Sequence, residues 1–171
     1  MTTFRALALL AAHPAAADRA RREAQTSSDR HHLPFLRATV LESLRLWPTT
    51  PMVLRQTTRE TVWEHGVMPA NTGVLIYAPF FHRDDARLPY AHTFAPELWS
   101  TERTEADWPL IPFSGGPAIC PARHLVQMLS SAVLASLIEE RAVRLVPPDR
   151  LDPARLPGTL DNYSLRFVLE E

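Results

Sequence analysis

Sixteen prolines against only five glycines break this chain of 171 residues at many fixed points and few flexible ones. Proline is accepted at the first position of a helix but disrupts its interior, so prolines mark where helices begin and end. Pro34 starts a run whose apolar residues recur every three or four positions, which indicates one buried face, and Pro48 follows its end at Trp47. The same reasoning predicts four helices, over residues 4–12, 14–25, 34–47 and 121–141.

Short runs rich in β-forming residues lie between and after these helices. They predict strands over residues 52–58, 73–78, 143–146 and 165–169. The run over 73–78 has the composition of a central strand, and a turn is expected at residues 64–66. The chain is therefore expected to be an α+β protein, mainly α.

Charge and cysteine content exclude several classes of protein. The formal net charge is −1, from 18 arginines and no lysine against 19 acidic residues, which argues against a nucleic-acid binder. The single cysteine, Cys120, excludes an internal disulfide and an all-cysteine zinc site. No run approaches 18 apolar residues, so we expect no membrane-spanning helix and a cytoplasmic location.

The segment around the cysteine, residues 108–123 (the Cys loop), carries the most chemical information. Cys120 directly precedes Pro121, the predicted first residue of the last helix, and a helix N-terminus favours thiolate over thiol. Gly115 and Gly116 would let the backbone lie close to a flat ring, and Phe113 would keep water from the sulfur. These features suit a thiolate that ligates the metal of a planar cofactor.

Other interpretations of Cys120 remain open on the residues alone. A lone cysteine is often a buried structural residue. It could also be a nucleophile paired with His124, about one turn along the same helix. A zinc site would have to combine it with His31, His32 or His124, although no second cysteine or ligand spacing supports this.

The Cys loop resembles the heme-binding loop of the cytochromes P450, which reads Phe-x-x-Gly-x-Arg-x-Cys-x-Gly. Phe113, Gly116 and Cys120 match this pattern. Ala118 replaces the basic residue, which would remove a hydrogen bond to a heme propionate, and Ala122 replaces the last glycine. The resemblance implies that Cys120 binds the iron of heme b. The residues it implies around the heme are Phe113, Ser114, Gly115, Gly116, Pro117, Cys120 and Ala122.

Further motifs resemble the same family, in the same order. Glu42 and Arg45 match the Glu-x-x-Arg of its K helix, which positions the Cys loop from behind; by spacing alone they would be an exposed ion pair worth about 0.2–0.5 kcal/mol. Arg55 stands where the family often places a propionate-binding arginine. Residues 82–84 read His-Arg-Asp, and residues 94–99 resemble a Phe-x-Pro-Glu-Arg-Trp segment. There Leu98 replaces the arginine of a triad, so either the triad is broken or Arg83 or Arg103 completes it.

The resemblance implies a cytochrome P450 fold limited to its C-terminal part, with the J, K and L helices and short strands but no I helix. Residues 1–171 would then be an incomplete domain. The implied function is that of a heme-thiolate monooxygenase portion, which supports O2-dependent oxidation of a small organic substrate when complete. The alternative is a truncated, catalytically inactive remnant, or a heme-binding or interaction module.

The same resemblance implies substrate contacts and partners. Thr50, Met52 and Val53 are candidate substrate contacts, and residues 160–162 resemble another pocket-lining segment. The implied partner is an electron-transfer protein, either a ferredoxin or a reductase, which would dock on the proximal face near Arg123 and His124. A complementing N-terminal portion is a further candidate partner. Neither a nucleic acid nor a membrane is expected.

Overall fold

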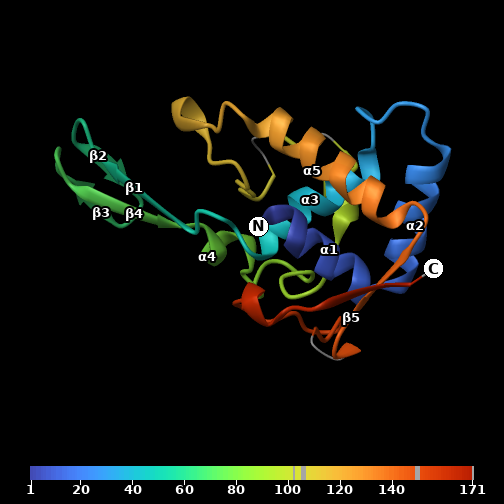
Figure 1. The fold of residues 1–171 in the computed structure, drawn as a ribbon. Helices are drawn as coiled ribbons and strands as arrows, with labels where there is room; N and C mark the ends of the chain where they lie inside the picture. The colour runs from blue at the N-terminus through green and yellow to red at the C-terminus, as the bar shows by residue number, and fades with distance from the viewer. Residues whose placement is uncertain (102, 105–106, 149–150, 171) are drawn as a thin grey trace.

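The computed structural model describes residues 1–101, 103–104, 107–148 and 151–170. Its body is built from α1 (Thr2–Ala12), α2 (Pro14–Thr26), α3 (Pro34–Leu46) and α5 (Arg123–Ile138). Helix α3 contacts α1, α2, α5 and the short 3-10 helix η1 (Pro96–Trp99), so it lies at the centre of this body (Figure 1). The described part of the chain is thus mixed helix and strand with helix predominant, as the sequence predicts.

Helix α3 is buried on nearly all sides rather than on the single face that its periodicity indicates. Apolar residues such as Leu36, Val40 and Leu44 fill the core, but the polar Glu42 and Arg45 are buried beside them. Its N-terminus is capped from another helix, because both carboxylate oxygens of Glu23 accept backbone N–H groups from the first turn of α3, at 2.8 and 2.9 Å. The helix therefore depends on its neighbours at its end as well as along its length.

The described strands form three two-stranded antiparallel ribbons. The pairs are β1 (Met52–Gln56) with β4 (Gly73–Tyr77), β2 (Thr61–Trp63) with β3 (Gly66–Met68), and β5 (Ala142–Leu145) with β6 (Phe167–Glu170). Figure 1 shows β1 to β4 as an arm that projects from the helical body. The prediction of a central strand over 73–78 is wrong, because β1 is the single partner of β4 among the described strands and the residues of β4 alternate between exposed and half-buried.

Two helix boundaries matter for the site. The short helix α4 (Ala78–His82) follows β4 and carries a histidine into the interior. Helix α5 begins at Arg123, two residues later than predicted, so Pro121 is not its first residue. The carbonyl of Cys120 accepts the backbone N–H of Arg123 at 3.2 Å, so the cysteine sits in the turn that leads into the helix.

None of the described helices is both long and apolar enough to span a membrane.

Candidate functional site

A cavity of about 540 Å³ opens where the Cys loop meets the end of α3 and the start of the β1–β4 ribbon. Six of the residues predicted for the site line it: Thr50, Val53, Arg55, Phe113, Ser114 and Cys120. They come from segments more than 50 residues apart in the sequence, which the fold brings to one place. Arg55 is the one charged side chain among the described residues that line the cavity.

The Cys loop curls so that Phe113 and Cys120 lie together on the cavity wall. The backbone N–H of Cys120 donates to the carbonyl of Phe113 at 2.9 Å, and a 3-10 turn, η2 (Gly116–Ala118), lies between them. Ser114 and Gly116 have positive φ angles of 66° and 61°, a conformation that glycine adopts without strain. A Cβ built at Gly116 would meet nothing within 4 Å, so that side of the loop is open. Cys120 itself is half-buried rather than enclosed in a core.

Several predicted site residues do not line the cavity. Met52 is 55% exposed, and Gly115, Gly116, Pro117 and Ala122 belong to the Cys loop but do not line the cavity. Residues 160–162 are likewise absent from it; the side-chain oxygen of Asn162 instead accepts a hydrogen bond from Arg5 at 3.1 Å. Alternation along β1 explains Met52, because its neighbour Val53 is the residue that faces inward.

Sequence reasoning missed several apolar lining residues, among them Ile76, Ile111 and Val126. Ile76 is paired with Val53 across the ribbon, so the two present one apolar surface to the cavity. Alternation in β4 could have indicated Ile76, but nothing local marks Ile111 or Val126 as neighbours of the cysteine. Ala118 also lines the cavity, at the place where the resembling loop has a basic residue.

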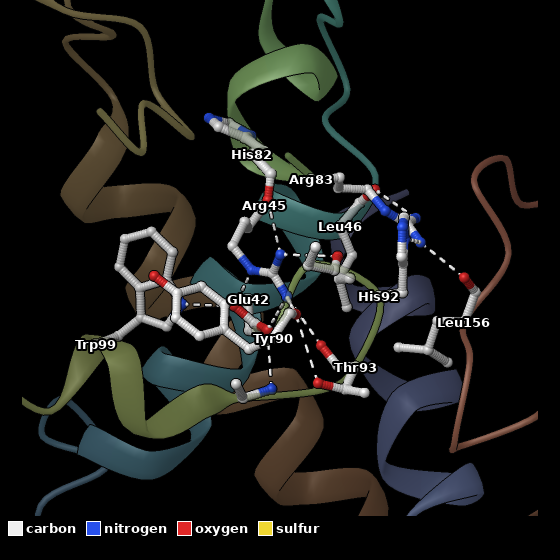
Figure 2. Close-up of polar contacts among 12 residues, drawn as sticks. Glu42, Arg45, Leu46, His82, Arg83, Tyr90, His92, Thr93, Trp99 and Leu156 are labelled. Atoms are coloured by element: carbon white, nitrogen blue, oxygen red, sulfur yellow. Dashed lines mark hydrogen bonds and ion pairs between the residues drawn. The ribbon is translucent and has the colours of Figure 1, made fainter. Parts of the chain in front are cut away.

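Glu42 and Arg45 form a fully buried ion pair behind the cavity, not the exposed pair that their spacing alone suggests. The guanidinium donates to the two carboxylate oxygens at 2.6 and 2.8 Å. It also donates to four backbone carbonyls, those of His82, Tyr90, Ala91 and Thr93, at 2.8 to 3.2 Å (Figure 2). Arg45 therefore fixes the loop between α4 and η1, because every one of its nitrogens has an acceptor.

Neutral N–H groups, and no third charged side chain among the described residues, complete the hydrogen bonding of Glu42. The carboxylate of Glu42 accepts the backbone N–H of Ala95 and the indole N–H of Trp99, each at 2.9 Å (Figure 2). Arg83 and Arg103, the two candidate replacements for the missing arginine, bind elsewhere: Arg83 donates to the carbonyls of Leu156 and Pro157, and Arg103 to that of Trp108. Leu98 thus removes a charge, and N–H donors beside it satisfy the carboxylate.

His82 connects this buried network to the Cys loop. Its carbonyl accepts from Arg45 at 2.8 Å, and its ring Nε2 accepts the backbone N–H of Ile111 at 2.9 Å. The side chain is fully buried, and burial lowers the pKa of His82 to about 4, with a smaller lowering from the charge of Arg45. The imidazole is therefore neutral near pH 7, and its proton belongs on Nδ1.

This buried histidine predicts a pH-dependent stability. Below pH 6.5 the unfolded chain protonates His82 while the folded chain does not, so stability falls as the pH drops from 6.5 towards 4. At pH 5 we expect a loss of about 2 kcal/mol from this group relative to pH 7. Urea unfolding of the wild type and of His82→Gln at both pH values isolates the contribution of His82, because every other ionisable group, including the neighbouring Glu42 and Arg45, is common to both proteins. An equal pH dependence in the two proteins would contradict the assignment.

The structure does not favour the other interpretations of Cys120. His124 is exposed, and no hydrogen bond joins it to Cys120 among the described residues. His31 and His32 are exposed in the turn before α3. Over residues 1–101, 103–104, 107–148 and 151–170 there is no group of three or more His, Cys, Asp or Glu side chains that could hold a metal ion. A cysteine on the wall of an apolar cavity is also not a simple core residue.

Comparison with known proteins gives one consistent result. The family model described as Cytochrome P450 matches residues 1–160. Cytochrome P450 98A8 of Arabidopsis thaliana is 34% identical over 142 residues, covering 80% of this chain. Methyltetrahydroprotoberberine 14-monooxygenase of Papaver somniferum is 30% identical over 171 residues, covering 91% of this chain. A crystal structure of a cytochrome P450, CYP102L1, superposes with a TM-score of 0.83 at 26% identity, covering 99% of this chain and 42% of that one.

The lengths of these relatives are also informative. The alignments cover 29% of the Arabidopsis protein and 32% of the Papaver protein. The chain therefore spans about a third of the length of these curated relatives.

Proposed function

Because the chain belongs to the cytochrome P450 family of monooxygenases, whose cofactor is heme b, we propose that Cys120 ligates the heme iron through its thiolate. The observation that carries this proposal is that the lone cysteine lies on the wall of a cavity of about 540 Å³. Heme offers a flat apolar ring, two propionates and an iron atom. The cavity offers apolar walls, one guanidinium and one thiol, so the residues present fit the group.

Different residues of the chain would bind different parts of the cofactor. Held by the thiolate of Cys120, heme would supply the activation of O2 for oxidation of an organic substrate. Phe113, which lines the same cavity as Cys120, would limit hydration of the sulfur. Arg55, exposed at the cavity edge, is the cation available to a propionate. Thr50 and Val53 are the candidate substrate contacts that the lining supports, whereas the exposure of Met52 does not support a role for it.

We extend the proposal to the activity of the whole protein. The chain would be the heme-ligating portion of a monooxygenase that acts on a small organic substrate in the cytoplasm. The segments that its relatives carry beyond the matched third would complete the site, supplied by a complementing N-terminal portion. An electron donor, either a ferredoxin or a reductase, would dock near the exposed His124 and the half-buried Arg123.

Protection of the thiol from alkylation tests this function. Cys120 is the only cysteine of the chain, so mass spectrometry of iodoacetamide-treated protein reports on this residue alone. Saturating heme is expected to slow its alkylation by at least about tenfold, because a coordinated thiolate is not free to react. Bound heme with an unchanged alkylation rate would show that another residue holds the iron.

Arg55 gives a second, smaller prediction. Arg55→Ala is expected to weaken heme binding about fivefold, corresponding to about 1 kcal/mol, since a charge-assisted hydrogen bond is weakened by its exposure. Arg59→Ala is the matched control, because Arg59 is exposed nearby and does not line the cavity. Heme titration followed by absorbance measures both. Equal affinities of the two variants would remove Arg55 from the site.

An inactive interaction module is the second candidate function, and one observation favours it. Leu125, Leu129 and Val133 recur every four residues along α5, and each is about half exposed. Such a stripe is typical of a surface that contacts another protein segment. If the purified chain takes up no heme but binds a fluorescent hydrophobic dye, and Leu129→Glu abolishes the dye signal, this alternative is the better account.

A further inference from the structure

We propose that His82 is a positioning residue that holds the Cys loop against the buried Glu42–Arg45 pair. It deepens the proposed function, since the functional meaning of this contact rests on the heme-ligating role of Cys120. The contact itself is a property of the heme-free chain and can be tested there.

One side of the connection is rigid. His82 ends α4, and its carbonyl accepts from Arg45, whose guanidinium is held by Glu42 and by three further carbonyls (Figure 2). All three side chains are fully buried. A buried guanidinium whose three nitrogens all have acceptors resists displacement, because moving it would leave its N–H groups and their acceptors unpaired.

On the other side of His82, hydrogen bonds join its ring to the Cys loop and continue along the loop to Cys120. The ring Nε2 of His82 accepts the backbone N–H of Ile111, and the indole of Trp108 donates to the carbonyl of Phe81 at 2.7 Å. Both bonds anchor the first half of the Cys loop. Ile111 then accepts the N–H of Ser114 at 3.1 Å, and Phe113 accepts the N–H of Cys120 at 2.9 Å. A fixed position of Ile111 therefore restricts the loop backbone that carries Phe113 and Cys120.

Histidine suits this place for a chemical reason. The contact needs an acceptor on a side chain that can be buried, and a neutral imidazole provides it at Nε2. Nδ1 has no hydrogen-bond partner among the described residues, so the Nε2 side carries the connection. Glutamine can place its Oε1 near the position of Nε2. Phenylalanine fills the space without an acceptor, and asparagine is too short to reach the same amide.

The experiment measures the heme-free chain first. In His82→Phe we expect the amide exchange of Ile111 and Cys120, and the alkylation rate of Cys120, to rise about tenfold, because the loop loses its anchor. His82→Gln should stay within about twofold of wild type. His92→Phe is the control, since His92 contacts Arg83 and Asp85 and not the Cys loop. If His82→Phe does not fold, His82→Asn takes its place with the same expected increase.

Three results would overturn the proposal. The first is a Cys120 alkylation rate in His82→Phe, or in its replacement His82→Asn, equal to that of wild type. The second is a His82→Gln variant as reactive as His82→Phe. The third is an exchange increase spread evenly over α3 and the Cys loop, which would indicate a loss of global stability and no positioning role.

The heme-bound protein separates this proposal from the proposed function. If Cys120 ligates iron, His82→Phe should convert part of the red-shifted Soret band of the reduced carbon-monoxide complex to a form typical of a neutral ligand, and His82→Gln should restore it. If wild type itself shows no thiolate ligation, the proposed function fails. The alkylation and exchange results then still decide whether His82 positions the loop.

Discussion

Replacing Glu42 by alanine is expected to lower the free energy of unfolding by about 3–5 kcal/mol. The substitution leaves the guanidinium of Arg45 fully buried with only carbonyl partners, and it strips an acceptor from Trp99 and from the Ala95 amide. A domain of this size is typically stable by about 5–15 kcal/mol, so the substitution would remove a large fraction of the total stability. Urea unfolding followed by circular dichroism measures the change.

An exposed ion pair of the same spacing provides the control. Asp18 and Arg21 also stand three residues apart, but their closest atoms are 3.8 Å apart and Asp18 is largely exposed. Asp18→Ala should change stability by no more than about 0.5 kcal/mol. A Glu42→Ala protein within about 1 kcal/mol of wild type would show that the network around Arg45 does not hold the loops in place.

The contrast between these two pairs shows where prediction from sequence ends. Acid-x-x-Arg spacing gives an i,i+3 contact in either case, and nothing local distinguishes Glu42 from Asp18. Burial decides the difference, and burial depends on α1, α2, α5 and η1 packing around α3. Only the resemblance to a family with a Glu-x-x-Arg helix singled out the correct pair.

Prolines explain why the helices were predicted well. Pro14 and Pro34 are the first residues of α2 and α3, so local chemistry alone fixed these boundaries. Pro121 was misleading, since the turn at Cys120 continues for two residues before α5 begins. The run over 73–78 was misjudged because an apolar strand in an exposed ribbon has the same composition as a central one.

The site was predicted in part. The sequence of the Cys loop predicts Phe113, Ser114 and Cys120 as site residues, and the family resemblance adds Arg55. All four line the cavity. Met52, a predicted substrate contact, does not line the cavity, because strand alternation turns it outward. The contact between His82 and Ile111 joins residues 29 positions apart, and no local pattern in the sequence encodes it. Long-range contacts of this kind have to be seen in the fold.

Replacing Cys120 by alanine has the largest expected effect on function. The chain has one cysteine, so this variant removes every thiolate that could bind iron. Any heme that remains would be held by the apolar walls and Arg55 and would lack a thiolate ligand. His124→Ala is the matched control, because His124 is close in sequence, exposed, and no part of the cavity lining.

The carbon-monoxide difference spectrum of the reduced, heme-reconstituted chain tests the central claim most directly, because the thiolate ligand itself sets the position of the Soret band. We expect a red-shifted Soret band in wild type and in His124→Ala, and its complete loss in Cys120→Ala. The same red-shifted band in Cys120→Ala, or a wild-type spectrum typical of a neutral ligand, would contradict the assignment of Cys120 as the ligand of the heme iron.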